Sequence, residues 1–186
     1  TLERLGFPAS YILYVGTIEP RKNLEILVKS YKQLVTMGKT KEHLVLVGRL
    51  GWGYDELLKQ IESPELQNRV HLVGYIHQKD LPLVYAGATL FVYPSLQEGF
   101  GFPPLEAMAC GAPTISSQTS SLIENLQGAA KLVPPDDPEC LTEAIHQLLN
   151  DEGIREQYRR EGFARASKFR WEETALQTLS CYQEVA

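Results

Sequence analysis

The sequence contains few cysteines and no spacing of residues that is typical of a metal site. Three cysteines occur among 186 residues, and no two of them form a Cys-x-x-Cys motif. An odd, unpatterned set predicts buried, reduced thiols rather than a disulfide framework. The four histidines show no His-x-x-x-His spacing, so we expect no bound metal. The cysteines are Cys110, Cys140 and Cys181.

Long hydrophobic runs and a strong positive charge are missing as well. The apolar segment Tyr11–Val15 is far shorter than the ~20 residues that span a bilayer. No signal peptide opens the sequence, so we expect a cytoplasmic protein, with any peripheral membrane contact made through a larger enzyme. The net charge of −5 argues against a nucleic-acid partner. A solvated helix face explains the basic stretch Arg155–Arg170 better than contact with anionic lipid does.

Short apolar runs alternate with amphipathic segments along almost the whole chain. The runs are continuously apolar, which is typical of strands in a parallel sheet covered on both faces. This order predicts an α/β fold, a Rossmann-like doubly wound parallel sheet of about six strands, with ligands at the carboxyl ends of the strands. We expect strands at Tyr11–Val15, Leu44–Val47, Val70–Val73, Leu90–Tyr93, Thr114–Ser116 and Lys131–Val133.

Helix signals occupy the segments between these runs. Leu24–Val35 has apolar residues along one helical face, with Asn23 as its N-cap and Gly38 as its stop. Asp137 precedes a proline and a second periodic segment, which is a typical helix start. Apolar residues at helical spacing also predict an amphipathic helix at Trp171–Ala186.

The segment after the first strand carries two adjacent cations. It lacks the Gly-x-Gly-x-x-Gly motif of a dinucleotide site. Gly16 ends the strand, and Arg21 and Lys22 precede the next helix. A guanidinium fork and a point charge together suit a diphosphate. A solvated, charged start of a helix explains the pair equally well. The functional interpretation is favoured only because the pair follows a strand of the sheet.

The segment after the fourth strand combines glycines, two acids and a helix start. Gly99 and Gly101 predict close approach of the backbone to a ligand and unusual dihedral angles. A pair of prolines beginning at Pro103 then starts a helix, and a glycine-rich loop leading into a helix N-terminus is a typical anion site. Glu98 and Glu106 flank this loop. Carboxylates beside an anion site fit hydroxyl groups, such as those of a sugar or ribose.

The string EGFGFPPLEAMACG resembles the signature of the group 1 glycosyltransferases, which have the GT-B fold and retain anomeric configuration. In that family a glutamate is followed by seven residues and a second glutamate, here Glu98 and Glu106. The string GTIEPRKN resembles the donor-phosphate loop of the family, and Val73–Ile76 resembles its nucleobase-side loop. The resemblance extends over essentially the whole chain.

The resemblance implies a role for each of these residues. Glu98 would be catalytic and face the transferred sugar, and Glu106 would hold the ribose hydroxyls. Tyr75 and Ile76 would lie against the nucleobase of a UDP- or GDP-sugar, with neither a cofactor nor a metal required. The donor phosphates would be bound by Gly16, Thr17, Arg21 and Lys22, and the sugar and distal phosphate by Gly99, Phe100, Gly101 and Phe102.

Two residues depart from the family pattern. Thr17 stands where some members have an arginine, which removes one phosphate contact. Pro103 lacks an N–H group, which removes one backbone donor from the turn.

The resemblance also implies that the chain holds one half of a GT-B enzyme. Residues 1–10 would end an interdomain linker, 11–170 would form the nucleotide-sugar-binding domain, and 171–186 would cross to an N-terminal acceptor-binding domain missing from the chain.

The function expected from these features is donor binding in a retaining hexosyltransferase of polysaccharide biosynthesis, with the chain inactive by itself. Cations and a helix N-terminus could neutralise the departing diphosphate. The resemblance favours front-face attack over a covalent adduct on Glu98. A non-catalytic nucleotide-sugar-binding module and a sugar-nucleotide epimerase or phosphorylase of the same fold remain alternatives. A nicotinamide-dependent dehydrogenase ranks last because its glycine motif is absent.

Overall fold

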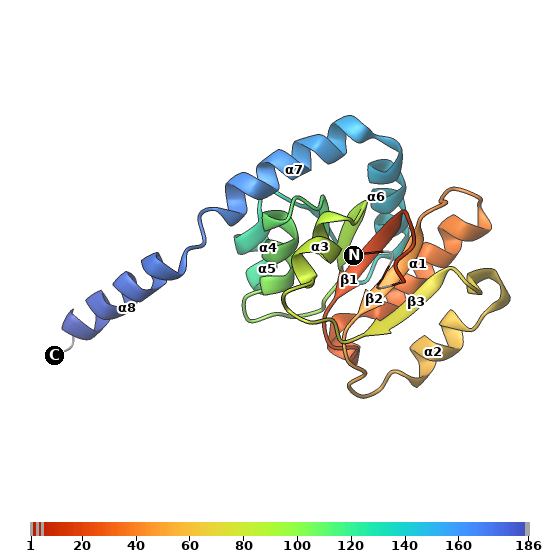
Figure 1. Cartoon of the computed structure of the whole chain (residues 1–186), viewed down its shortest axis with the longest axis horizontal. Helices are drawn as coiled ribbons and strands as arrows, with labels where there is room; N and C mark the ends of the chain where they lie inside the picture. Colours follow the sequence, from red (N-terminus) through yellow and green to blue (C-terminus); the bar gives the residue numbers. More distant parts are fainter. Residues whose placement is uncertain (1, 3, 5, 185–186) are drawn as a thin grey trace.

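The computed structural model describes residues 2, 4 and 6–184, which form one parallel sheet with helices packed on both faces (Figure 1). The sheet has six strands in the order β3-β2-β1-β4-β5-β6, and every pairing is parallel. The predicted α/β doubly wound fold is therefore confirmed. The strands are β1 (Tyr11–Val15), β2 (His43–Val47), β3 (Val70–Gly74), β4 (Leu90–Tyr93), β5 (Thr114–Ser117) and β6 (Lys131–Val133).

The apolar runs form strands because the central ones are covered on both sides. Ile12 and Leu13 of β1 are completely buried, and β4 is buried along its whole length. The edge strand β3 is only partly buried, and Leu72 on it is exposed. All six predicted strands are present, and their ends differ from the predictions by at most one residue.

Helices follow nearly every strand, as the alternation predicted. α1 and α2 pack together on one face with α6, and α3 and α4 pack on the other with α7. The α-helices are α1 (Leu24–Thr36), α2 (Asp55–Ile61), α3 (Leu81–Ala86), α4 (Phe102–Ala109), α5 (Ser120–Leu126), α6 (Pro138–Asn150), α7 (Glu152–Ala166) and α8 (Trp171–Glu184), and the short 3-10 helices are Pro20–Lys22 and Pro64–Leu66.

Of the two predicted N-caps, one forms its hydrogen bond and one does not. The Asp137 side chain accepts a hydrogen bond of 2.8 Å from the Cys140 amide at the start of α6, as predicted. Asn23 stands at the predicted N-cap position of α1, but its side chain makes no capping hydrogen bond, so the prediction holds for the position and not for the bond. The backbone of Asn23 is left-handed, with a φ of 57°. Its side-chain amide donates instead to the carbonyls of Pro94 and Pro135.

The basic stretch on α7 was interpreted from the sequence as a solvated helix face. The structure corrects this interpretation, because part of the stretch binds neighbouring elements of the domain. Three of its arginines donate to backbone carbonyls of neighbouring elements and thereby fasten α7 to the domain. Arg155 binds the carbonyls of Leu148 and Leu149, Arg159 that of Gly111, and Arg165 those of Glu124 and Asn125.

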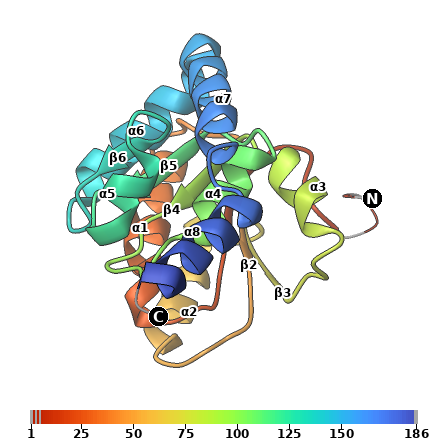
Figure 2. The same ribbon diagram turned by 90° about the vertical axis from the view of Figure 1, so that its left-hand side faces the viewer.

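The predicted C-terminal helix forms over Trp171–Glu184, and the predicted residues 185–186 lie outside the described part of the chain. The helix projects away from the sheet (Figure 1) and therefore lies in front of it when the molecule is viewed from that side (Figure 2). None of its described residues is buried, and the Trp171 ring stacks on Phe102 at a centroid distance of 6.1 Å. Cys181 is exposed on this helix, so the prediction of buried thiols is wrong for that residue, and Cys110 and Cys140 are only partly buried. Among the described residues, no helix has the length and apolarity to cross a membrane.

Backbone hydrogen bonds join the loops that follow β1, β2 and β3. The Gly16 amide donates to the Val47 carbonyl at 2.9 Å, and the Gly48 amide donates to the Gly74 carbonyl at 2.8 Å. Gly48 has a φ of +148°, and a Cβ atom there would overlap the Gly16 carbonyl oxygen. The close approach of these loops at the carboxyl edge therefore requires glycine at position 48.

We predict that Gly48→Ala destabilises the fold more than Gly128→Ala does. Both glycines have φ in the range that L-residues avoid, but a Cβ at Gly128 meets no atom within 4 Å. The control should lose about 1 kcal/mol of unfolding free energy, and Gly48→Ala roughly 2 kcal/mol more because backbone must move. Urea unfolding of both variants measures this, and equal losses would show that the loops are not tightly apposed.

Candidate functional site

Two loops meet between β1 and β4. At this point the sheet grows to one side through β2 and β3 and to the other side through β4, β5 and β6. The β1–α1 loop, residues 16–23, follows the central strand, and the β4–α4 loop, residues 94–101, follows its neighbour. The Leu96 amide and the Ser95 hydroxyl both donate to the Arg21 carbonyl, at 2.9 and 3.1 Å. Such a switch point at the carboxyl ends of parallel strands is where ligands of doubly wound folds bind.

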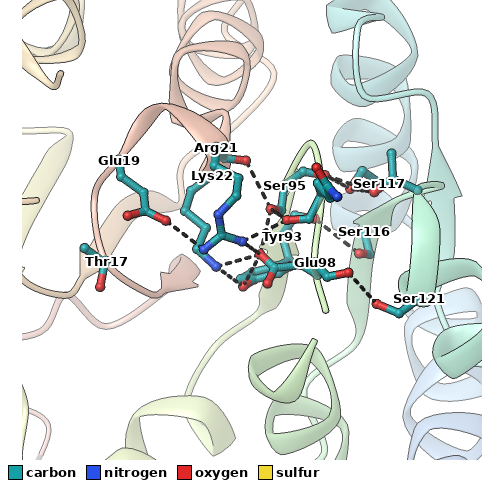
Figure 3. A network of polar contacts seen from close by, with 12 residues as sticks. Thr17, Glu19, Arg21, Lys22, Tyr93, Ser95, Glu98, Ser116, Ser117 and Ser121 are labelled. Carbon is teal, nitrogen blue, oxygen red and sulfur yellow. Dashed lines mark hydrogen bonds and ion pairs between the residues drawn. The ribbon is translucent and has the colours of Figure 1, made fainter. Parts of the chain in front are cut away.

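A charged network centred on Glu98 joins these two loops (Figure 3). The Oε1 atom of Glu98 accepts hydrogen bonds from Lys22 Nζ at 2.6 Å, from Ser95 Oγ at 2.7 Å and from the Tyr93 hydroxyl at 2.9 Å. The guanidinium of Arg21 also lies 3.0 Å from this oxygen. The side chains of Lys22 and Glu98 are only 9% and 10% exposed, so this ion pair is shielded from water. The structure thus brings together three of the residues predicted for the site.

The network keeps Glu98 ionised. Burial raises the pKa of the Glu98 carboxyl, but hydrogen bonds from Lys22, Ser95 and Tyr93 outweigh burial and hold the pKa below its ordinary value. Burial and the neighbouring carboxylate both raise the pKa of the Tyr93 phenol, so Tyr93 acts as a hydrogen-bond donor. Burial lowers the pKa of Arg21, yet the charge of Glu98 more than compensates and raises it.

Hydroxyl groups from β5, from the loop after it and from the start of α5 donate hydrogen bonds to carbonyls of β4 and of the β4–α4 loop, and the sequence pattern was not used to predict them. Ser121 donates to the Glu98 carbonyl at 3.1 Å, and Ser116 donates to the Tyr93 carbonyl at 3.2 Å. Ser117 and Thr119 both donate to the Ser95 carbonyl. The hydroxyl-rich string SSQTSS after an apolar run was the available signal, because neighbouring parallel strands end at the same edge.

The glycine-rich loop is shaped by one of its two glycines. Gly101 has a φ of +88° and stands just before α4, as a left-handed turn into the helix requires. Gly99 has no positive φ, and a Cβ there would meet no atom within 4 Å, so the prediction of an unusual dihedral is wrong for Gly99. Asn125 holds the loop by donating to the Phe100 carbonyl at 2.7 Å.

The N-terminus of α4 has fewer free amide donors than the sequence pattern suggested. The helix begins at Phe102, and the next two residues are prolines, so two of its first three residues have no N–H to offer. The amides of Gly101 and Phe102 and the positive end of the helix dipole remain for an anion.

The other predicted residues lie outside the Glu98 network. Glu106 is exposed on α4, where its carboxylate accepts a 2.9 Å hydrogen bond from the Tyr85 hydroxyl of α3. Tyr75 is 59% exposed after β3, whereas the Ile76 side chain is 6% exposed and packs into the core. Any contact of Ile76 with a ligand is therefore limited to its backbone. Gly16 and Thr17 directly follow β1 in the same loop as Arg21 and Lys22, and Thr17 is exposed.

No metal site accompanies this network in the part of the chain that the structure describes. Among residues 2, 4 and 6–184, no three histidine, cysteine, aspartate or glutamate side chains are grouped so that they could hold a metal ion.

The chain matches a known family over most of its length. The family model described as "Glycosyl transferases group 1" matches residues 7–165. O-antigen chain mannosyltransferase B of Escherichia coli is 39% identical over 173 residues, which cover 93% of this chain and 45% of that protein. The serotype-specific mannosyltransferase WbdA of Escherichia coli is 33% identical over 175 residues, which cover 93% of this chain and 22% of WbdA.

Solved structures share the fold. Sucrose-phosphate synthase from Thermosynechococcus elongatus superposes with a TM-score of 0.86 at 32% identity, over 99% of this chain and 48% of that one. HepE of Anabaena, solved in complex with UDP-glucose, superposes with a TM-score of 0.85 at 23% identity, over 100% of this chain and 51% of that one. The chain thus spans about half the length, or less, of these relatives.

We predict that the unfolding free energy decreases at acidic pH because Glu98 becomes protonated. Its folded pKa is lowered, so its contribution is fully present above the unfolded value of about 4.3 and is lost as pH falls through the folded pKa. Glu98→Gln should lower the unfolding free energy at neutral pH by about 1.5–3 kcal/mol and flatten its decline below pH 5.

Urea unfolding from pH 7 to pH 3 measures this dependence. Glu172→Gln on α8 is the control because its side chain is 75% exposed. A wild-type pH profile that runs parallel to that of Glu98→Gln would contradict the ion-pair assignment.

Proposed function

Because this chain belongs to the group 1 glycosyl transferases, we propose that it binds the nucleoside-diphosphate sugar of a hexosyl transfer that proceeds with retention of anomeric configuration. The observation that carries this proposal is the Glu98 network, in which two cations and a carboxylate meet at the switch point of the sheet. The carboxylate would face the transferred sugar, and the cations would face its diphosphate.

Lys22 and Arg21 suit the diphosphate for separate reasons. Lys22 is a buried point charge, and Arg21 is a half-exposed fork that already binds Glu19 and Glu98. Breaking the bond between sugar and phosphate leaves negative charge on the diphosphate, and fixed cations nearby stabilise that charge in the transition state. The Gly101 and Phe102 amides at the start of α4 would add backbone donors.

Glu98 competes with the donor for both cations. Without a donor, its Oε1 atom receives Lys22 and Arg21. A bound diphosphate would place a second anion beside Lys22 and Arg21. These two cations would then be shared between the diphosphate and Glu98. The carboxylate would then stay ionised next to the sugar, where it accepts hydrogen bonds from hydroxyls and stabilises positive charge that develops on the ring.

Glu106 and Tyr85 would hold the ribose. The carboxylate is exposed and oriented by the Tyr85 hydroxyl, so it can accept bonds from two vicinal hydroxyl groups. The distance along α4 from its N-terminus to Glu106 is about 6 Å, at 1.5 Å per residue, which suits the separation of ribose and phosphate.

The comparisons support a hexosyl donor and a larger enzyme. The relatives include two mannosyltransferases, and HepE was solved with UDP-glucose. Because the chain spans about half the length of mannosyltransferase B, we propose that the acceptor binds elsewhere in such an enzyme. The chain alone should bind the donor without transferring its sugar.

We predict that Lys22→Met weakens the binding of nucleoside diphosphates about 10- to 100-fold. Losing one charge-assisted contact corresponds to ~1.5–3 kcal/mol. Lys32→Met is the control, since Lys32 pairs with Glu65 on the surface. Calorimetric titration measures both affinities, with circular dichroism to verify folding. A folded Lys22→Met chain with wild-type affinity would refute the phosphate assignment.

We predict the opposite change in affinity for Glu98→Gln. Removing the carboxylate frees both cations from a competing anion, so nucleoside diphosphates should bind roughly 3- to 10-fold more tightly, while transfer by the complete enzyme falls. The same titration, with Glu56→Gln on the exposed face of α2 as control, measures the change. Weaker binding by Glu98→Gln would mean that Glu98 itself holds the nucleotide.

A further inference from the structure

An exposed arginine lies over an exposed tyrosine ring at the carboxyl ends of β2 and β3. The guanidinium carbon of Arg49 is 5.0 Å from the centroid of the Tyr75 ring, and Tyr75 is 59% exposed. This geometry is that of a cation–π pair. Because Arg49 is exposed as well, its N–H groups are accessible to a ligand at this edge of the sheet.

The backbone on both sides of this pair is fixed. The Arg49 carbonyl accepts a 2.9 Å hydrogen bond from the Ile18 amide, so the β1 loop holds Arg49 in place. The Gly48 amide donates to the Gly74 carbonyl, which joins the residues directly before Arg49 and Tyr75. The His77 ring meets Tyr75 edge-on at 5.8 Å. The pair is therefore placed before any ligand arrives.

Among residues 2, 4 and 6–184, no side chain forms an ion pair with the guanidinium fork of Arg49, unlike that of Arg21, Arg159 or Arg170. A charged fork held on an aromatic ring, without a carboxylate to neutralise it, can accept a ligand that presents two neighbouring acceptors.

The pair lies at the right distance from the proposed phosphate site. β3 is two strands from β1, and neighbouring strands are about 4.8 Å apart, so Tyr75 follows a strand about 10 Å from the one that ends at Gly16. A ribose bridges a gap of this order between a diphosphate and its base. This step rests on the proposed function, which places the diphosphate at Arg21 and Lys22.

We propose that Arg49, supported by Tyr75, selects guanine, so that the donor is a guanosine-diphosphate sugar. Guanine presents O6 and N7 as adjacent acceptors, and the arginine fork matches both. Adenine offers N7 beside an amino donor, and uracil offers O4 beside an N3–H donor. Neither of these two bases can receive both N–H groups of the fork, and each leaves one unsatisfied. Cytosine does offer two adjacent acceptors, O2 and N3, so CDP binding as tight as GDP binding would overturn the choice of guanine.

Titration of the chain with a set of diphosphates tests this assignment. GDP should bind at least about tenfold more tightly than UDP or ADP. Inosine diphosphate keeps O6 and N7 and should retain the preference over UDP. 7-Deaza-GDP lacks N7 and should lose most of it. UDP binding as tight as GDP binding would overturn the inference while leaving the proposed function intact. Failure of every diphosphate to bind would overturn both.

Variants at Arg49 separate base selection from simple charge. Arg49→Lys keeps the charge and loses the fork, so GDP affinity should fall to that of UDP, and UDP affinity should stay nearly unchanged. Arg160→Lys is the matched control, because Arg160 is exposed on α7. Tyr75→Leu should reduce the GDP preference in the same direction. A GDP preference that survives Arg49→Lys would overturn the assignment.

Discussion

The ion pair between Lys22 and Glu98 is the interaction on which the site depends. It joins loops that follow two neighbouring strands, and both side chains are almost completely shielded from water. A buried charge without its partner costs several kcal/mol, so neither loop can move away alone. Tyr93 and Ser95 complete the shell around the carboxylate. The cations are thus neutralised and oriented while the site is empty, and a diphosphate meets them without a large reorganisation of the protein.

The fold and the positions of the loops could be predicted from the sequence, but the contacts within the site could not. Continuous apolar runs located every strand, and the order of glycines, acids and prolines located the β4–α4 loop. The pairing of Lys22 with Glu98 joins residues 76 positions apart, and no local pattern encodes it. Asn23 makes no capping bond for the same reason, since its partners lie in loops distant in sequence. Gly99 was misjudged because composition does not reveal a dihedral angle.

Support for the glycine-rich loop comes from helices that follow it in the chain. Asn125 of α5 holds the Phe100 carbonyl, and Arg165 of α7 holds the Asn125 carbonyl at 2.8 Å. Phe169 meets Phe100 edge-on at 5.7 Å and lies under the Arg165 guanidinium. Hydrogen bonds through Asn125 and aromatic contacts through Phe169 therefore both connect Arg165 of α7 to the glycine-rich loop. A substitution at Arg165 would change the position of the glycine-rich loop through Asn125, although Arg165 itself would not contact a ligand.

The projecting helix α8 has a thermodynamic consequence of its own. A helix of 14 residues is marginal in water unless tertiary contacts add to its stability, and no described residue of α8 is buried. Its helix–coil equilibrium is therefore nearly independent of the unfolding of the sheet. Amide hydrogens along α8 should exchange with solvent through local fraying, orders of magnitude faster than those of β1 and β4. Only a surface that covers Trp171 and Leu179 would slow them to the rate of the core.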